Sequence, residues 1–410
     1  MHNPKQGVIE AKAALLTQIS DSAVRMAWLQ EWLMDEVAVV KAEGAAAVPQ
    51  ITFRDLQLEA ISTTQKDRIR RRGCVVIRGV FDRQQAMAWN DEISRYIDEN
   101  HYYEKAKDKV GLDRYFSTLA AGRPQIFGLY WSRPQMQARQ HENMSAVRGW
   151  LNHLWNFTGP DGLQEFDPDR QCNYADRVRR REPGDKSLGL SAHCDGGSIE
   201  RWCDASFHRV YHEVFFGDVD AYDPFNAVGR TQTEEIPSPA VCSVFRTFQG
   251  WTALTRQGPG DGTLKIIPIA RAMAWMLLRA LQPDVAPDDL CGAAAGRALA
   301  ANPTWHQLLL EAEVSIPIVE PGDTVWWHPD VIHAVEGEHR GHNYSNVIYI
   351  GAAPWCEKNA RFLPRQAERF LAGKSSPDFA AEDYEVDFIN RATLDDLSAL
   401  GKKQWGLLPW

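Results

Sequence analysis

Residues 322–335 read "GDTVWWHPDVIHAV" and hold two apolar runs on either side of a turn. Gly322 and Asp323 are typical turn residues, and the run "TVWW" that follows is β-branched and aromatic, as strands prefer. The segment "HPD" then places a proline that cannot donate to a strand ladder, so regular pairing is expected to stop there. The stretch therefore predicts a strand, a turn and a second strand in the run "VIHAVEG" (331–337), which contains His333.

Similar short apolar runs, broken by Gly, Pro and Asp, recur along most of the chain. Many short strands at regular spacing, with helices outside them, favour a β-sandwich or barrel over alternating β-α-β units. The runs that predict strands are "CVVIRGVF" (74–81), "QIFGLYW" (125–131), "KSLGLSAH" (186–193), "RVYHEVFFG" (209–217), "AVCSVFRTFQGWTALT" (240–255), "LKIIPI" (264–269) and "SNVIYIGAAP" (345–354).

Helical patterns surround these runs. Residues 8–43 predict one long helix, because apolar residues recur every three or four positions and Gly44 follows. A second helical piece is expected over residues 54–72, and Asp82 is placed to cap a helix that follows it. The predicted organisation is an N-terminal helical region (1–72), a β-rich core (73–356) with a helical insertion at about 269–313, and a charged helical tail (357–410) packed on the core.

Composition narrows the class of protein. The 410 residues are 44% hydrophobic, which suits a globular chain, and carry a net charge of −9 without a basic tail. Nucleic acid and anionic membrane surfaces are therefore not expected as partners. The N-terminus lacks the apolar stretch of a secretory signal, so we expect a cytoplasmic protein. The seven cysteines are scattered and contain no Cys-x-x-Cys pair, which indicates neither a disulfide framework nor a thiolate zinc site.

Two His-x-Asp pairs occur, His193 with Asp195 and His328 with Asp330. On a strand, residues two apart point to the same side, so either pair could offer an imidazole and a carboxylate to one ion. Those ligands suit Fe(II), Mn(II) or Zn(II). Pro329 makes the second pair the weaker candidate, since it interrupts strand geometry, and its expected role is to shape the turn. His333 is a plausible third ligand for the first pair.

This arrangement resembles the Fe(II)/2-oxoglutarate-dependent dioxygenase superfamily, in which His-x-Asp comes early and a distal His comes late. The stretches "RGCVVIRGVFDRQQAMAWNDEI", "GWTALT", "GDGTLKIIPIA" and "GDTVWWHPDVIHAV" fit that pattern. More narrowly, "YWSRPQMQARQH", "SAHCDGGSIERW", "FRTFQGWTAL" and "YIGAAPWCEKNA" resemble a YbiU-like branch, formerly a domain of unknown function. The resemblance runs from about residue 50 to the end of the chain. It implies an α+β fold with a double-stranded β-helix (jelly-roll, cupin-like) core flanked by helices.

The resemblance also implies a chemistry. Fe(II) would be held by His193, Asp195 and His333, with 2-oxoglutarate as cosubstrate and O2 as oxidant. Succinate and CO2 would be the co-products of oxidation, most often hydroxylation, of a C–H bond in a small polar substrate such as an amino or organic acid. The substrate's identity, the position oxidised and the oligomeric state are left open.

The far carboxylate of 2-oxoglutarate needs a cation, best supplied by an arginine. The candidates are Arg246 in "VFRTFQGW" and Arg340 in "EGEHRGHN", because the strand "YSNVIYIG", where many relatives carry this residue, has no basic residue. Arg246 is preferred, since a charge inside an apolar strand needs a partner. The alternative is that Arg246 pairs with a structural carboxylate.

Candidate substrate residues lie in the resembling motifs or beside the ligands, and each also suits packing or ion pairing: Tyr130, Trp131, Arg139, Arg201 and Trp202. The run "DRVRRREPGD" (176–185) is interpreted either as a basic rim for an acidic substrate or as a solvated charge run. Two other functions stay open. One is a cupin-like metal-dependent enzyme that does not use 2-oxoglutarate, and the other is a non-catalytic jelly-roll binding protein.

Overall fold

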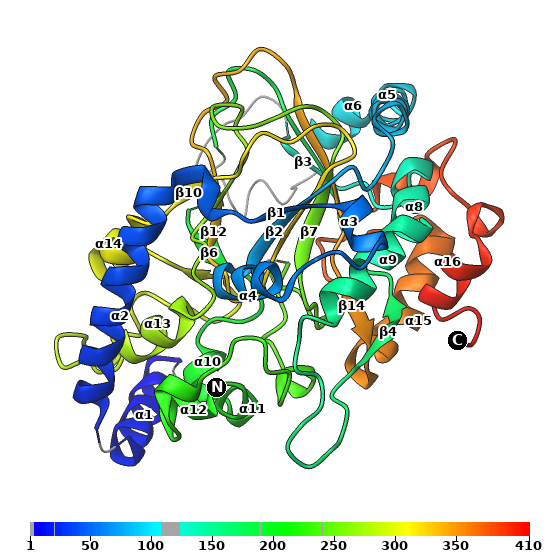
Figure 1. Cartoon of the computed structure of the whole chain (residues 1–410). Coiled ribbons are helices and arrows are strands. Elements are labelled where there is room, and N and C mark those ends of the chain that lie inside the picture. Colours follow the sequence, from blue (N-terminus) through cyan, green and yellow to red (C-terminus); the bar gives the residue numbers. More distant parts are fainter. Residues whose placement is uncertain (1–3, 20, 108–123, 188–190, 240) are drawn as a thin grey trace.

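The structure, a computed structural model, describes residues 4–19, 21–107, 124–187, 191–239 and 241–410. It is a mixed α+β fold in which helices surround two sheets (Figure 1). The larger sheet has seven strands, which are antiparallel except where β1 runs parallel to β2. In spatial order its strands are β1 (Gln50–Thr52), β2 (Cys74–Arg78), β11 (Thr324–Trp327), β7 (Gln249–Ala253), β13 (Ser345–Tyr349), β5 (Val178–Arg181) and β3 (Ile126–Phe127).

The second sheet carries two of the predicted metal ligands. In spatial order its five strands are β10 (Val314–Ser315), β8 (Leu264–Ile266), β12 (His333–Val335), β6 (His193–Cys194) and β9 (Leu299–Ala300). Strand β12 lies between β8 and β6, and His333 is paired directly opposite His193. A separate pair joins β4 (Asp167–Cys172) to β14 (Ala353–Trp355).

The stretch 322–335 forms the strand, turn and strand that its sequence predicts. Gly322 has φ of +94°, a left-handed conformation that favours glycine, and a Cβ there would lie 2.3 Å from the carbonyl oxygen of Phe81. The Asp323 carboxylate accepts the Gly79 N–H at 2.8 Å and pairs with Arg78 at 2.7 Å. This turn therefore fixes the start of β11 against the end of β2.

The N-terminal helices are more divided than predicted. Residues 8–43 belong to two helices, α1 (Pro4–Gln18) and α2 (Ser22–Glu43), and residues 54–72 to α3 (Phe53–Gln57) and α4 (Thr63–Arg72). Helix α4 ends at Gly73, which is left-handed and packs against Val331. The Asp82 side chain caps α5 (Arg83–Glu99), as predicted, and α6 (Tyr102–Lys107) follows.

The prediction of a strand over residues 209–217 is wrong, because this run lies in α11 (Ala205–Val210) and α12 (His212–Phe215). The buried side chains in and between these two helices, Phe207, Tyr211, Val214 and Phe215, recur at helical spacing, and Asp204 caps α11 through the Ser206 N–H. Three more helices lie among the predicted strands: α8 (Arg133–Gln140), α9 (Glu142–Asn152) and α10 (Glu200–Cys203). Residues 188–190 of the run "KSLGLSAH" lie outside the described residues.

The residues predicted as a helical insertion and a helical tail contain helices. The insertion contains α13 (Ala272–Arg279), whose apolar side chains pack against α2, and α14 (Pro303–Leu310). The tail contains α15 (Glu357–Ala372) and α16 (Ala399–Gln404). The described residues also form short 3-10 helices: η1 (Gly44–Ala47), η2 (Val219–Ala221), η3 (Arg230–Gln232), η4 (Tyr384–Asp387) and η5 (Leu394–Asp396). The domain boundaries stay predictions.

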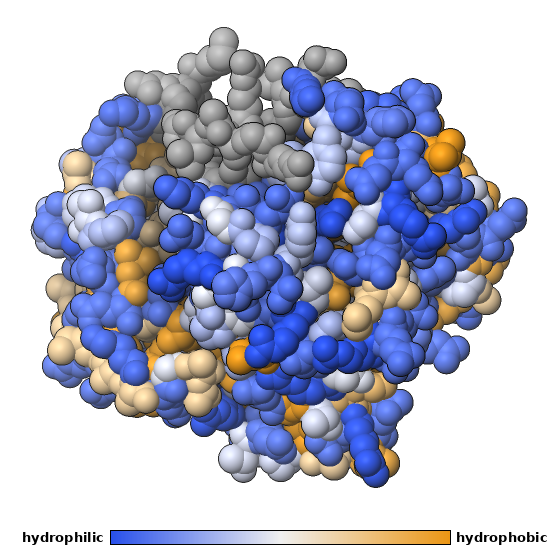
Figure 2. All heavy atoms as spheres, turned by 90° about the horizontal axis from the view of Figure 1, so that it is seen from above, coloured by the Kyte–Doolittle hydropathy of each residue, from blue (hydrophilic) through white to orange (hydrophobic). Residues whose placement is uncertain are grey.

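Hydrophilic residues dominate the face seen in Figure 2, while the large aliphatic and aromatic side chains gather in the interior. Among the described helices, none is long and apolar enough to cross a membrane. Strands of both sheets approach the predicted metal ligands. The assignment of this pair of sheets to the double-stranded β-helix class stays a prediction.

Candidate metal centre

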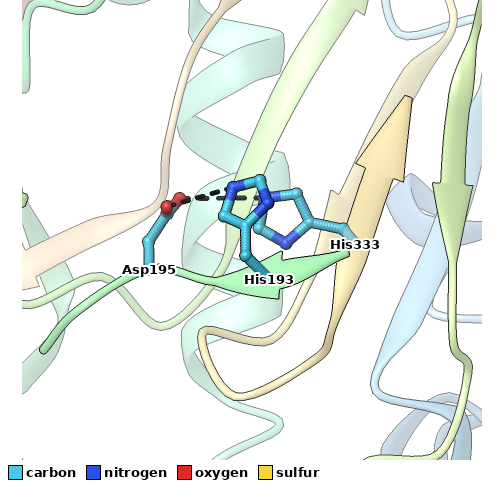
Figure 3. Close-up of side chains that lie close together, drawn as sticks. All are labelled: His193, Asp195 and His333. Atoms are coloured by element: carbon cyan, nitrogen blue, oxygen red, sulfur yellow. Dashed lines mark ion pairs between the residues drawn. The ribbon is translucent and has the colours of Figure 1, made fainter. Parts of the chain in front are cut away.

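His193, Asp195 and His333 come together at the junction of β6 and β12 (Figure 3). One potential ligand atom from each residue lies within 4.8 Å of the other two. The Asp195 carboxylate oxygens lie 3.6 Å from Nε2 of His193 and 3.8 Å from Nε2 of His333. These separations are too long for hydrogen bonds and leave a gap between the three groups.

Hydrogen bonds to the backbone orient both imidazoles. Nδ1 of His193 lies 2.7 Å from the carbonyl oxygen of Ser191, and Nδ1 of His333 lies 3.2 Å from that of Val331. Each Nδ1 must therefore carry the proton of the neutral ring, which leaves Nε2 as an acceptor. Both Nε2 lone pairs consequently face the carboxylate, as metal coordination requires.

The electrostatics favour the same protonation states. Burial, together with the neighbouring His193, lowers the pKa of His333 to about 4, so its imidazole is neutral at pH 7. Burial alone would raise the pKa of Asp195, but His333, His193 and Arg246 outweigh this and lower it. His333 thus offers a neutral nitrogen and Asp195 an anionic oxygen without a prior loss of protons.

Gln249 on β7 holds the carboxylate in place. Its Nε2 donates to Oδ2 of Asp195 at 2.8 Å, while its own Oε1 is buried without a hydrogen-bond partner among the described residues. The Trp327 ring lies beside that of His333, with ring centroids 5.1 Å apart. The sequence analysis did not select Gln249, although an amide inside the apolar strand that carries "GWTAL" is a signal of this kind.

The ligand set fits a borderline divalent ion such as Fe(II). Two imidazoles and one carboxylate, with other coordination positions left free, are the ligands of non-haem Fe(II) oxygenases. Cys194 takes no part, since burial raises the pKa of its thiol to about 12 and its Sγ lies 3.5 Å from the Arg201 guanidinium. A thiolate-bound metal is therefore not supported at this position.

A cavity of ≈ 130 Å³ opens beside the three ligands, and residues of both sheets line it. Its polar wall residues include cations, phenols and an amide, and its apolar wall is aromatic and aliphatic. Besides the ligands, the lining residues are Ile126, Tyr174, Asp176, Arg177, Pro239, Val241, Cys242, Arg246, Gln249, Gly250, Leu264, Trp327, Ala334, Val335, Tyr349, Gly351 and Phe379.

Arg246 reaches this cavity and Arg340 does not. Among the described residues, the Arg246 guanidinium has no hydrogen-bonding or ion-pair partner, and it lies 5.5 Å from the centre of the Tyr174 ring. Gly351 gives it room, because a Cβ there would lie 2.9 Å from the Arg246 Cδ. Arg340 is exposed, and its backbone N–H donates to the Gly260 carbonyl. The premise that Arg246 lies inside a strand is wrong, since it precedes β7.

A family comparison agrees with part of the sequence-based resemblance. Residues 5–407 match the family described as Gig2-like. The chain belongs to the Gig2-like family. It is 44% identical over 408 residues to "Uncharacterized protein YbiU" of Escherichia coli (strain K12), a match that covers 98% of this chain and 96% of that one. Similarity to YbiU is therefore confirmed.

Solved structures of other proteins show the same fold across the whole Gig2-like chain. A protein described as "the Putative Oxidoreductase from Salmonella typhimurium LT2" superposes with a TM-score of 0.93 at 43% identity, covering 99% of this chain and 98% of that one. GlcNAc Inducible Gene 2 (GIG2, DUF1479) from Candida albicans superposes with a TM-score of 0.84 at 28% identity, covering 98% and 89%.

Three predicted substrate residues of this Gig2-like chain lie away from the cavity. Tyr130 and Trp131 pack in a separate apolar cluster with Phe370 and Trp405, and Trp131 donates its indole N–H to the Lys374 carbonyl. Arg139 is completely buried and donates to the carbonyl oxygens of Tyr130 and Asp176. The Tyr130 hydroxyl is buried without a hydrogen-bond partner among the described residues, whereas the polar groups of Trp131 and Arg139 donate to the backbone. A substrate role for the three residues stays a prediction.

The other two predicted substrate residues lie nearer the metal ligands. Trp202 packs in the core and donates its indole N–H to the Leu277 carbonyl at 3.0 Å. Arg201 lines a second cavity, which borders Asp195 and Arg246 and also includes Arg230 and Lys358. Neither Arg201 nor Trp202 lines the cavity beside the three ligands.

The second His-x-Asp pair does not form a shared metal site. His328 stacks on Trp155 with ring centroids 4.7 Å apart, and its Nε2 lies 2.9 Å from the Pro224 carbonyl. Burial lowers the pKa of His328 to about 3, so its ring stays neutral. Its Nδ1 accepts the Asp330 N–H, which shapes the turn as predicted, whereas the Asp330 carboxylate turns away towards Arg201 and Arg230.

The arginine run at 176–185 is not a solvated charge run. Arg179 and Arg181 are only 3% and 1% exposed, and they donate to Gln257 and to the carbonyls of Gly262 and Glu336. Arg177 lines the cavity, and its Nη1 is buried without a hydrogen-bond partner among the described residues. The run therefore contributes a second cation to the cavity.

Proposed function

We propose that this Gig2-like protein is an Fe(II)- and 2-oxoglutarate-dependent oxygenase that oxidises a C–H bond of a small polar molecule, such as an amino or organic acid. The observation that carries the proposal is that two imidazole Nε2 atoms and one carboxylate converge in the same cavity as an arginine that has no hydrogen-bond or ion-pair partner among the described residues. Bound Fe(II), supplied with 2-oxoglutarate and O2, would provide the oxidation that releases succinate and CO2.

The residues of the chain have separable tasks in this proposal. His193, Asp195 and His333 would hold the metal from one side and leave the other side free for cosubstrate and oxidant. Gln249 would fix the orientation of the carboxylate. Arg246 would bind the far carboxylate of 2-oxoglutarate, because its planar guanidinium can form two parallel hydrogen bonds with a carboxylate. Arg340 is left out because it is exposed.

The apolar part of the lining would protect the reaction from solvent. Trp327, Leu264 and Val335 line the cavity, as does Tyr349 on β13. Excluding water strengthens the electrostatic attraction between the arginine and a bound carboxylate. The oxidoreductase description of the Salmonella typhimurium relative agrees with a redox reaction.

The test is anaerobic addition of Fe(II) and then 2-oxoglutarate to the protein stripped of metal. We expect a weak visible charge-transfer band for the wild type, and loss of that band in His333→Ala. Absence of the band in the wild type, or its full persistence in His333→Ala, would contradict the proposal. An Fe(II) site that forms without the band would favour a metal-dependent enzyme that does not use 2-oxoglutarate, and absence of metal binding would favour a binding protein.

A further inference from the structure

The backbone that carries Asp195 is held by one buried arginine. Gly196 and Gly197 have φ values of +85° and +92°, which turn the chain sharply after the ligand. Arg201, on α10, donates Nη2 to the carbonyl oxygens of Asp195 and Gly196 and Nε to that of Gly197, each at 3.3 Å. The two glycines therefore direct consecutive carbonyls towards a single guanidinium.

The same guanidinium reaches the segment that carries His333. Its Nη1 donates to Oδ1 of Asp330 at 2.9 Å, and Asp330 lies three residues before His333. Val331, the next residue, supplies the carbonyl that receives Nδ1 of His333. The contact between Arg201 and Asp330 thus joins the two stretches of chain that orient the three ligands.

The strand ladder alone holds these two stretches weakly. Strand β6 contains only two residues, and it pairs with β12 at the single position where His193 faces His333. Asp195 lies beyond the end of β6 and has no strand partner. Its position relative to His333 must therefore depend on contacts other than strand pairing.

The link is buried and its carboxylate is fully bonded. The side chains of Arg201 and Asp330 are each 2% exposed. The Asp330 carboxylate also accepts the Tyr211 hydroxyl at 2.9 Å and Nη2 of Arg230 at 2.8 Å. A buried ionic cluster costs desolvation energy, so a protein with an apolar cluster of similar volume in its place is often equally stable or more stable. Its position between the ligand-bearing segments indicates a geometric role.

We infer that Arg201 and Asp330 are positioning residues that hold Asp195 and His333 at the separation a bound metal requires. The inference rests on the proposed metal centre. The Arg201–Asp330 link touches no ligand side chain, and it acts through the Asp195 and Gly196 carbonyls at one end and through the Val331 carbonyl at the other. The chain after Asp330 and the chain before Arg201 then move as one unit.

The test measures metal binding apart from activity. Mn(II) is titrated into metal-free wild type, Asp330→Asn and the control Asp323→Asn, and free Mn(II) is followed by electron paramagnetic resonance. Asp323 is also buried and paired with an arginine, Arg78, but it lines neither cavity that borders Asp195. We expect Asp330→Asn to weaken Mn(II) binding by about 10- to 100-fold, as loss of groups that orient ligands typically does. Asp323→Asn should bind Mn(II) as the wild type does.

A milder variant covers the case in which Asp330→Asn does not fold. Tyr211→Phe removes one donor to Asp330 and keeps the ring, and it should weaken Mn(II) binding several-fold. At saturating Co(II), its visible spectrum should differ from that of the wild type, a change that a loss of stability alone would not produce.

Three results would overturn the inference. One is unchanged Mn(II) affinity in whichever of these two variants folds, and another is an equal loss of affinity in Asp323→Asn. The third is failure of the unchanged protein to bind Mn(II), which would remove the proposed metal centre and this inference with it.

Discussion

Replacement of Arg246 by Met is expected to remove the discrimination between 2-oxoglutarate and a keto acid that lacks the far carboxylate. Arg246 lines the cavity beside the ligands, and among the described residues its guanidinium contacts the Tyr174 ring but has no hydrogen-bond or ion-pair partner. Methionine keeps much of the side-chain volume next to Gly351 and removes the charge. The chelating groups of 2-oxoglutarate would bind the same metal ion in the wild type and in Arg246→Met.

The size of the effect follows from the number of hydrogen bonds lost. A guanidinium can form two charge-assisted hydrogen bonds with a carboxylate, each worth about 1.5 kcal/mol at the lower end of the usual range. Their loss corresponds to about 3 kcal/mol, or about a 100-fold rise in the dissociation constant of 2-oxoglutarate. Pyruvate shares the keto-acid chelate but has no far carboxylate, so its affinity should be nearly unchanged.

The assay titrates 2-oxoglutarate and pyruvate anaerobically into the Fe(II)-loaded protein and follows the visible band. Arg246→Lys should lose an intermediate part of the discrimination, since it keeps the charge but not the planar fork. Arg340→Met is the matched control and should behave as the wild type, because Arg340 is exposed. Full discrimination in Arg246→Met would refute the reasoning and would direct attention to Arg177, the other arginine that lines the cavity.

The other predictions concern stability. Burial lowers the pKa of His306 from its ordinary 6.5 to about 4. The contribution of neutral His306 to the free energy of unfolding is therefore complete above pH 6.5 and is lost as the pH falls towards 4. The loss is about 3 kcal/mol, and urea unfolding of His306→Gln should depend less on pH in that window, whereas an identical pH dependence would contradict this. Arg139→Met should lower the free energy of unfolding by about 3 kcal/mol, because the carbonyls of Tyr130 and Asp176 lose their donor. Its Mn(II) affinity should be unchanged, and a shift in that affinity would show that Arg139 serves the metal site. Asp82→Ala should cost about 1 kcal/mol in urea unfolding, because the first turn of α5 loses its cap, and no loss would show that the cap is dispensable.

Some features could be predicted because their causes are local. The turn at Gly322 and Asp323, the strand "TVWW" and the cap at Asp82 each depend on residues within a few positions of one another. Pro329 also distinguished the two His-x-Asp pairs, because a proline interrupts strand geometry at its own position. Local patterns failed where two periods compete, as in residues 209–217, whose aromatic residues suit a strand but are buried at helical spacing.

The composition of the site depended on long-range packing. His193 and His333 are 140 residues apart in the chain, and only the pairing of β6 with β12 sets them opposite each other. The contacts of Arg139, Arg201 and Arg246 could not be told apart from sequence, because the residues that each one meets come from distant segments of the chain. The first donates to backbone carbonyls, the second joins two chain segments, and the third faces a cavity. A side chain's partners are set by the segments that fold around it, so local sequence can name a candidate ligand but packing determines which charges stay available for a substrate.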